Sequence, residues 1–266
     1  MRLEERVAIV TGSTRGIGKA IARRFVEEGA SVVLNGRDRN RLEDAAEELR
    51  AIGGTVLAVQ ADVTRSDDVK RLIDKTIKEF KKIDILVNNV GGDDPDLPAT
   101  RDKEPITRQR LVEETSDDFW DAVVNLNLKS MFSCANLVAP YMKEQRSGKI
   151  INIASGVARQ GSARSSAAYV SAKAGVTGFT RQLCRELAPF GINCNTIAPG
   201  MIMTEILAQR MASLSEDQNA ATAAIPMGRI GRPEEIASVA AFLASDDASY
   251  VNGAIIDVNG GRFLAP

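Results

Sequence analysis

Seven short apolar runs, rich in β-branched residues, alternate along this chain with longer segments of helical periodicity. The runs have the length and composition of strands that are buried on both faces, as in a parallel sheet. They span residues 7–10, 32–34, 56–59, 83–87, 150–154, 192–197 and 254–258. Because parallel strands are joined by right-handed helical crossovers, the alternation predicts an α/β fold, a doubly wound parallel sheet of seven strands with helices on both faces.

The intervening segments carry their apolar residues at helical spacing, and Ser66 is the predicted N-cap of one of them. One face consists of Leu42, Ala45, Ala46, Leu49 and Ile52, and a second of Val69, Leu72, Ile73, Ile77 and Phe80. No repeat, low-complexity tract or linker divides the chain. The sequence therefore predicts a single domain over residues 1–266.

Two stretches interrupt the alternation. Residues 91–114 contain three prolines and dense charge, too long and polar for an ordinary connection, and are predicted to be an insertion. Residues 201–226 follow the Pro199-Gly200 turn, are rich in Met and Ala, and are predicted to form a substrate lid. Both stretches follow the carboxyl ends of predicted strands, where ligands bind in such sheets.

The composition excludes several classes of function. The chain has 266 residues with 34 basic and 35 acidic side chains, so its formal net charge of -1 gives no overall attraction for nucleic acid or an anionic membrane. Histidine is absent from the sequence, which excludes Ser-His and Cys-His nucleophiles and His-ligated metal sites. Proton transfer near neutral pH then falls to Tyr, Lys or a carboxylate, and no metal is expected.

The cysteines and the N-terminus indicate the compartment. Cys134, Cys184 and Cys194 are widely spaced and form no CxxC pair, which favours a reducing environment. The first apolar run is shorter than that of a signal peptide, and no later segment approaches 18 consecutive apolar residues. We therefore expect a cytoplasmic protein that does not contact membranes.

The turn after the first predicted strand is rich in glycine. It reads Thr11-Gly12-Ser13-Thr14-Arg15-Gly16-Ile17-Gly18, with GxxxGxG spacing. Glycines at such a turn let a pyrophosphate approach backbone N–H groups at the start of the next helix, as in Rossmann folds. A tight connection without a ligand has the same composition, so the turn alone leaves both interpretations open.

Tyr169 and Lys173 lie four residues apart in a segment of helical period, which places them on one helix face. An ammonium group near a phenol stabilises the phenolate and lowers the phenol pKa, so that the phenol can act as acid or base near neutral pH. The same spacing also arises by chance on many helices. The pair alone does not decide between catalysis and structure.

Taken in order, the motifs of this chain resemble those of the short-chain dehydrogenase/reductase family, in its single-domain branch that includes 3-oxoacyl-carrier-protein reductases. They are TGSTRGIG, Asp62-Val63, Asn88-Asn89-Val90-Gly91, Asn127, Ser155, Tyr169-x-x-x-Lys173 and Pro199-Gly200. Val90 stands where the family usually has alanine. The resemblance extends from about residue 7 to residue 261 and implies an enzyme that transfers hydride to or from a nicotinamide dinucleotide.

The resemblance implies four catalytic residues. Tyr169 would exchange a proton with the substrate oxygen, and Ser155 would hydrogen-bond the same oxygen. Lys173 would bind the nicotinamide ribose and lower the tyrosine pKa. Asn127 would hold a water that links Lys173 to solvent.

It also implies a set of cofactor-binding residues. Asp62 would accept a hydrogen bond from the adenine, Asn88 would support the backbone near the ribose, and Thr204 with Ile202 would contact the carboxamide; for Thr204, a helix cap is an equal alternative. The whole set is Gly12, Thr14, Arg15, Gly16, Ile17, Gly18, Arg37, Asp62, Val63, Asn88, Gly91, Tyr169, Lys173, Pro199, Gly200, Ile202 and Thr204.

The second predicted strand ends without an acid, at Asn35 and Gly36. An acid there would bond the ribose 2′-hydroxyl of NAD and repel a 2′-phosphate. Arg15 and Arg37 are instead available to bind the 2′-phosphate of NADP through charge-assisted hydrogen bonds, although both also have the character of surface arginines. The sequence therefore predicts NADP(H) as the preferred cofactor, with NAD(H) as the alternative.

The expected function is that of an NADP(H)-dependent oxidoreductase that interconverts a ketone and a secondary alcohol. An NAD-dependent alcohol or cyclic diol dehydrogenase is the alternative within the enzyme class, and a non-catalytic dinucleotide-sensing regulatory protein is the alternative outside it. The expected partners are a small-molecule carbonyl or alcohol substrate and further copies of the chain in a homotetramer. The apolar residues of the predicted lid favour a small or medium ketone over a carrier-bound acyl chain.

Overall fold

The computed structural model describes residues 1–93, 111–213 and 222–264. Within them, seven strands form one sheet in the order β3-β2-β1-β4-β5-β6-β7, and every neighbouring pair is parallel. The strands are β1 (Val7–Val10), β2 (Ser31–Gly36), β3 (Val56–Gln60), β4 (Ile85–Asn88), β5 (Gly148–Ile153), β6 (Ile192–Pro199) and β7 (Ile255–Val258). The predicted doubly wound seven-stranded sheet is confirmed.

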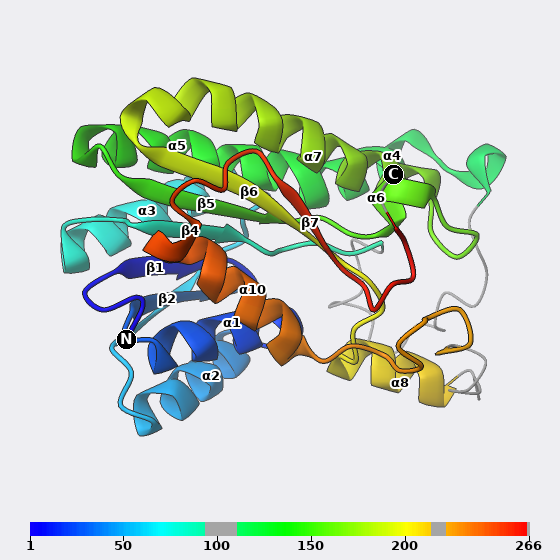
Figure 1. Ribbon diagram of the computed structural model, residues 1–266, viewed down its shortest axis with the longest axis horizontal. Coiled ribbons are helices and arrows are strands. Elements are labelled where there is room, and N and C mark those ends of the chain that lie inside the picture. The colour runs from blue at the N-terminus through cyan, green and yellow to red at the C-terminus, as the bar shows by residue number, and fades with distance from the viewer. Residues whose placement is uncertain (94–110, 214–221, 265–266) are drawn as a thin grey trace.

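Helices cover both faces of this sheet (Figure 1). The longer ones are α1 (Gly16–Glu27), α2 (Arg39–Ala51), α3 (Ser66–Phe80), α5 (Ser130–Gln145), α7 (Ala167–Leu187) and α10 (Pro233–Ala244). The shorter ones are α4 (Asp117–Val124), α6 (Val157–Gln160) and α8 (Glu205–Ser213), with a π-helical turn, η2 (Asn125–Lys129), and 3-10 turns η1 (Val112–Glu114), η3 (Ala188–Phe190) and η4 (Asp246–Ala248).

The alternation of side chains along each strand divides the core in two. Ala8 and Val10 of β1 pack in a cluster with α1, α2 and α10, whereas Ile9, between them, packs in a second cluster with α3, α5 and α7. Successive residues of a strand point to opposite faces, so a run of three apolar residues supplies both layers. This explains why the strands are apolar throughout.

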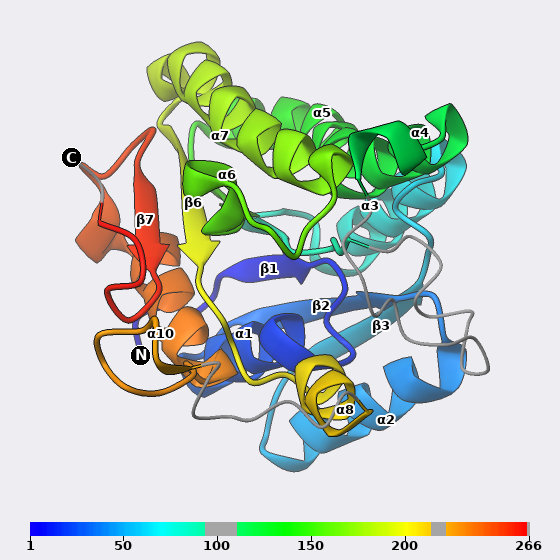
Figure 2. The ribbon, with the colours of Figure 1, turned by 90° about the vertical axis from the view of Figure 1, so that its right-hand side faces the viewer.

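The strand order reverses between β1 and β4, which are neighbours in the sheet although β2 and β3 lie between them in sequence. The connections after β1 and after β4 therefore leave toward opposite faces, and a crevice forms outside the carboxyl ends of these two strands. In Figure 2, α6 and α8 lie at this end of the sheet. The fold thus directs a ligand to one edge.

Two local predictions are wrong. Ser66 is the first residue of α3 rather than its cap; Arg65 occupies the N-cap position and makes no side-chain cap hydrogen bond. Ile52 is predicted on the apolar face of the second helix. Because α2 ends at Ala51, Ile52 is its C-cap and is 45% exposed.

Most of the predicted insertion, residues 94–110, and residues 214–221 of the predicted lid lie outside the described residues. The described part of the predicted lid includes helix α8. No helix in the described ranges combines the length and the apolar character needed to cross a membrane.

Candidate active site

The glycine-rich turn connects β1 to α1 in a shape that side chains would obstruct. Gly12 has a positive φ of 63° and its N–H donates to Asn35 Oδ1 at 3.3 Å. A methyl group on Gly18 would overlap the carbonyl oxygen of Gly12. Asn89 Nδ2 donates to the carbonyls of Thr11 and Gly12 at 2.9 and 3.1 Å, so Asn89 supports the turn.

The N–H of Gly16, at the start of α1, already has an anionic partner. It donates to Glu205 Oε2 at 3.0 Å, and a methyl group on Gly16 would lie 3.2 Å from Thr204 Cγ2. A carboxylate from α8 therefore occupies the position where a helix N-terminus binds a phosphate. Because the turn already binds one anionic group, it is suited to binding the pyrophosphate of a dinucleotide.

Three arginines approach one another beside this turn. The pKa of Arg15 is lowered, mainly by burial and next by the charge of Arg41; Glu205 raises it and Arg37 lowers it. Arg37 Nη1 lies 3.9 Å from Asp62 Oδ2, while Arg41 Nε lies 3.6 Å from Asp38 Oδ2. Positive charges this close together favour the binding of an anion between them.

The end of β2 is fixed by an amide instead of an acid. Asn35 is buried, and its Nδ2 donates to the carbonyls of Val59 and Ala61 at 3.4 and 3.0 Å. Gly36 is required beside it, because a methyl group there would lie 2.5 Å from Thr14 Cγ2. As the sequence predicted, no carboxylate of β2 faces the turn.

Asp62 and Val63 follow β3 at the same edge. Asp62 Oδ1 accepts hydrogen bonds from the N–H and the hydroxyl of Thr64, at 3.0 and 2.7 Å, and Val63 is buried. The Asp62 side chain is 29% exposed, so its second oxygen, Oδ2, remains accessible beside Arg37.

Tyr169 and Ser155 lie near each other at the carboxyl edge of the sheet. Ser155 lies two residues after β5, and Tyr169 lies in the first turn of α7. Burial raises the pKa of Tyr169 to about 12; the neighbouring Ser155 side chain lowers it and the charge of Asp93 raises it. The expected net lowering of the Tyr169 pKa is not found, because removal of the phenolate from water is the larger effect.

Lys173 lies one turn after Tyr169 and is 2% exposed. Its Nζ donates to the carbonyl oxygen of Ile153 at 2.8 Å and lies 5.9 Å from the centroid of the Tyr169 ring. Burial lowers the pKa of Lys173 to about 7. The amine of Lys173 can therefore exchange a proton near neutral pH, next to the phenol.

Gly91 fits closely between Asn127 and Lys173. A methyl group on Gly91 would lie 2.6 Å from Asn127 Oδ1 and 2.7 Å from Lys173 Nζ. Asn127 belongs to the π-helical turn η2, and its amide exchanges hydrogen bonds with the backbone of Gly92 at 3.0 and 2.8 Å. The four predicted catalytic residues are thus brought to one place by β5, η2 and α7.

A buried polar chain underlies this site. Asn88 Nδ2 donates to Asn152 Oδ1, Asn152 Nδ2 to Thr180 Oγ1, and Thr196 Oγ1 also to Thr180 Oγ1, each at 2.8 Å. Asn88 Oδ1 is buried without a hydrogen-bond partner. The chain ties β4, β5 and β6 to α7 below the catalytic groups.

Backbone hydrogen bonds join the end of β6 to the segment after β5 and to β7. Gly156 donates to the carbonyl of Pro199 at 2.8 Å, and Gly200 donates to that of Val258 at 2.9 Å. Ile202 is buried and pairs with Gly231. Thr204 Oγ1 accepts the N–H of Leu207 at 3.3 Å, which matches the expected alternative of a helix cap.

The family model described as "Enoyl-(Acyl carrier protein) reductase" matches residues 12–262 of this chain. A 3-oxoacyl-[acyl-carrier-protein] reductase FabG of Thermotoga maritima is 38% identical over 267 residues, covering 99% of this chain and all of its own length. The chain belongs to the short-chain dehydrogenase/reductase family. It is an oxidoreductase that acts on CH–OH and C=O groups and uses a nicotinamide dinucleotide.

Other members of the family show the same likeness. A FabG of Staphylococcus epidermidis strain RP62A is 39% identical over 259 residues, which is 97% of this chain and 98% of the relative. The crystal structure of a levodione reductase superimposes with a TM-score of 0.88 at 33% identity and covers 98% of both chains. The short-chain dehydrogenase/reductase fold is therefore present over essentially the whole chain.

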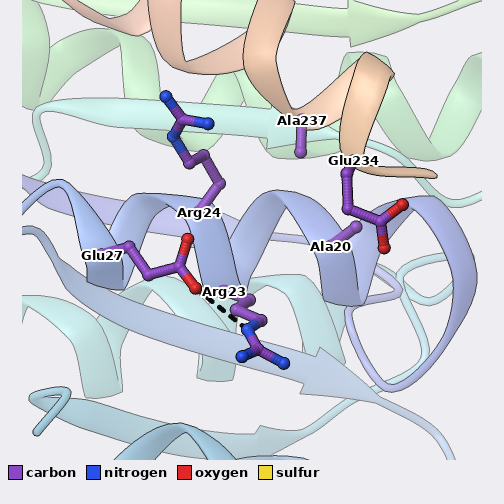
Figure 3. A pocket seen from close by; sticks show the side chains of 6 residues that line it. All are labelled: Ala20, Arg23, Arg24, Glu27, Glu234 and Ala237. Atoms are coloured by element: carbon purple, nitrogen blue, oxygen red, sulfur yellow. Dashed lines mark hydrogen bonds and ion pairs between the residues drawn. The ribbon is translucent and has the colours of Figure 1, made fainter. Parts of the chain in front are cut away.

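Two surface hollows lie apart from the catalytic residues. One, between α1 and α10, is lined by Ala20, Arg23, Arg24, Glu27, Glu234 and Ala237 (Figure 3). Arg23 and Glu27 are paired there at 3.0 Å, and the lining holds equal numbers of arginines and glutamates, so the hollow has no preference for either charge. The second lies beside the end of β7, next to Met227 and Leu264.

Sequence reasoning missed Asp93, Glu205 and Arg41, which contact or electrostatically influence the predicted site residues. Each belongs to a segment without a family motif, and only its neighbours in space reveal it. Among the described residues, no cluster of Cys, Asp and Glu has the arrangement of a metal site, and the chain contains no His.

Proposed function

We propose that this short-chain dehydrogenase/reductase is an NADP(H)-dependent enzyme that interconverts a ketone and a secondary alcohol, with Tyr169 as the acid/base. The observation that carries the proposal is that Lys173 Nζ lies 5.9 Å from the centroid of the Tyr169 ring, with Ser155 near enough to lower the pKa of the phenol. No histidine competes for this role. A phenol, a hydroxyl and an ammonium at one sheet edge are suited to holding and protonating a carbonyl oxygen.

In ketone reduction, Ser155 donates a hydrogen bond that holds the substrate oxygen, and Tyr169 Oη donates its proton to that oxygen. When bound, the nicotinamide supplies the hydride for the carbonyl carbon in reduction and accepts it in oxidation. Lys173, with a pKa of about 7, stabilises the phenolate that remains and returns a proton to it. Asn127, beside Gly91, continues the path of proton transfer from Lys173 toward solvent.

NADP(H) is the proposed cofactor because the charges around the glycine-rich turn suit a phosphate. Arg15, Arg37 and Arg41 are close enough to affect one another, and Asn35 stands where an acid would favour NAD(H). Gly12, Gly16 and Gly18 would receive the pyrophosphate, displacing Glu205. Asp62, Val63 and Asn88 would border the adenosine, and Ile202 with Thr204 the carboxamide.

The proposed substrate has a ketone next to apolar carbon. The names of the relatives point to 3-oxoacyl groups on a carrier protein and to levodione, whereas the sequence favoured a small or medium ketone. A ketone next to apolar carbon is common to all of these compounds. Ile202 and Met211 are buried in the segment that we propose as the lid, so that segment has apolar side chains suited to covering such a substrate.

We also propose that the enzyme is a cytoplasmic homotetramer. Phe132 of α5 is 51% exposed and packs edge-to-face on Phe179 of α7 at 6.3 Å, and Trp120 of α4 is 38% exposed. Apolar surface on these three helices is suited to a second copy. Light scattering tests this: a mass well above 28.6 kDa is expected, and the monomer mass would contradict it.

The experiment that tests the function is a substrate panel with both cofactors, monitored by nicotinamide absorbance. Tyr169→Phe keeps the ring and removes the proton, so we expect turnover to fall by roughly 10² to 10⁴ while cofactor affinity is retained. A chemistry-limited turnover equal to wild type would contradict the proposal. Cofactor binding without turnover on any substrate would favour the regulatory alternative, and faster reduction of a carrier-bound 3-oxoacyl group than of cyclic ketones would identify the substrate class.

A further inference from the structure

The N-terminus of the catalytic helix α7 is held by a carboxylate from another part of the chain. Asp93 Oδ2 accepts the N–H of Ser166 at 3.0 Å, and Asp93 Oδ1 accepts the Ser166 hydroxyl. Ser166 is the N-cap of α7 and is only 4% exposed. The contact joins the segment after β4 to the cap of the helix that carries Tyr169 and Lys173.

The helix itself provides no acid for this position. α7 spans 21 residues, and its first turn contains no Asp or Glu. A helix of this length has unpaired N–H groups and a partial positive charge at its N-terminus, where an anion is stabilising. Asp93 supplies that anion from 73 residues earlier in the sequence.

The same contact leads directly to Tyr169. Ser166 Oγ donates to Asp93 and accepts the N–H of Tyr169 at 3.2 Å, so one hydroxyl links the carboxylate to the catalytic residue. Gly92, the neighbour of Asp93, exchanges two hydrogen bonds with the Asn127 amide. Residues 91–93 therefore contact both helical elements that carry catalytic groups.

We propose that Asp93 is a positioning residue for the reaction: through Ser166 it fixes the first turn of α7, and with it the Tyr169 phenol, relative to Ser155 and Asn127. This inference rests on the proposed acid/base role of Tyr169. Asp93 does not touch the reacting atoms in this assignment; it acts through the helix cap.

An electrostatic effect accompanies the positioning. Within the described ranges, the charged groups around the phenol are Asp93, from the segment after β4, and Lys173, on α7 itself, while Ser155 contributes a neutral hydroxyl before α6. The negative charge of Asp93 disfavours the phenolate and raises the pKa of Tyr169. Removing that charge should lower the pH at which the phenol ionises.

The test is Asp93→Asn, which keeps the size and an acceptor oxygen but removes the charge. We expect kcat for alcohol oxidation to fall about tenfold with little change in KM, because the phenol is less well aligned. The midpoint of the pH profile should move down by roughly 0.5 to 1 unit. Asp93→Glu should recover part of the lost kcat and return the midpoint toward the wild-type value.

Two further variants separate positioning from general destabilisation. Ser166→Ala removes the linking hydroxyl but leaves the charge of Asp93, so kcat should fall without a shift of the midpoint. Asp67→Asn removes an exposed acid from the first turn of α3 and should change neither quantity. The proposal would be overturned if the midpoint of the pH profile in Asp93→Asn equalled that of the wild type. It would also be overturned if kcat fell among the variants only in proportion to their melting temperatures.

Ultraviolet difference titration against Tyr169→Phe reports the ionisation of Tyr169 without any turnover. A lower titration midpoint in Asp93→Asn supports the role of Asp93, whatever the activity of Tyr169→Phe. An active Tyr169→Phe variant would contradict the proposed function alone. An unchanged titration together with an unchanged pH profile would overturn the role of Asp93 while leaving the function intact.

Discussion

Lys173 Nζ donates a hydrogen bond to the carbonyl oxygen of Ile153 at 2.8 Å, which joins the middle of α7 to the end of β5. The ammonium is 2% exposed, and burial lowers its pKa from 10.5 to about 7. A charged group buried in this way destabilises the folded state whenever it is protonated. The buried ammonium therefore reduces the stability of the folded state at and below neutral pH.

Lys173→Met should stabilise the protein in a pH-dependent manner. The unfolded lysine binds its proton more tightly than the folded one, so wild-type stability rises with pH between about 7 and 10.5. The gain in the free energy of unfolding should be about 1 to 3 kcal/mol at or below pH 7 and should disappear toward pH 10.5. Denaturant unfolding over this range measures it. Lys75→Met, at an exposed position on α3, is the control, and a gain independent of pH would show that Lys173 is not buried as a charge.

Gly91→Ala should lower turnover strongly without unfolding the protein. The added methyl group would lie 2.6 Å from Asn127 Oδ1 and 2.7 Å from Lys173 Nζ, so the ammonium must shift away from its place beside Tyr169. We expect kcat to fall by about 100-fold, as for other displacements of catalytic groups. Gly178→Ala, in α7 with open space around it, should keep activity and stabilise the helix by about 1 kcal/mol. Full activity of Gly91→Ala would mean that this packing has no catalytic role.

Arg37→Ala should weaken NADPH binding and leave NADH binding nearly unchanged. A charge-assisted hydrogen bond to a phosphate is worth about 1.5 to 3 kcal/mol, so the Kd for NADPH should rise about 10- to 100-fold. Fluorescence titration with both cofactors measures the effect. Arg23→Ala, on the outer face of α1 where Arg23 pairs with Glu27, should change neither Kd. Equal affinities of the wild-type enzyme for the two cofactors would contradict the assignment.

Glu205→Gln should bind either cofactor more tightly. The Glu205 carboxylate accepts the Gly16 N–H at 3.0 Å, where it competes with the pyrophosphate and repels it. Loss of the charge should lower the Kd by about 2- to 5-fold at low salt, and less at high salt. Glu144→Gln, at an exposed position on α5, is the control in calorimetric titrations. A weaker affinity in Glu205→Gln would show instead that the carboxylate helps to shape the turn.

Much of the fold could be predicted because local patterns suffice for it. The seven apolar runs lie within one or two residues of the observed strands, since strands buried on both faces must be apolar throughout. Element ends were less predictable, as Ser66 and Ile52 illustrate, because the cap depends on how the chain enters and leaves the sheet. The identity of the family followed from motifs whose spacing is preserved along the chain.

The sequence by itself determined the reaction class and the candidate set of Asn127, Ser155, Tyr169 and Lys173, since these residues stand at the positions of the family's motifs. Only the tertiary structure decided their electrostatics: burial raises the pKa of Tyr169 and lowers that of Lys173, whereas their spacing on a helix suggested mutual stabilisation. The structure alone also brought Asp93 to Ser166 and Glu205 to Gly16, from 73 and 189 residues away. Desolvation and long-range contacts depend on how the layers pack, and a linear pattern does not record that.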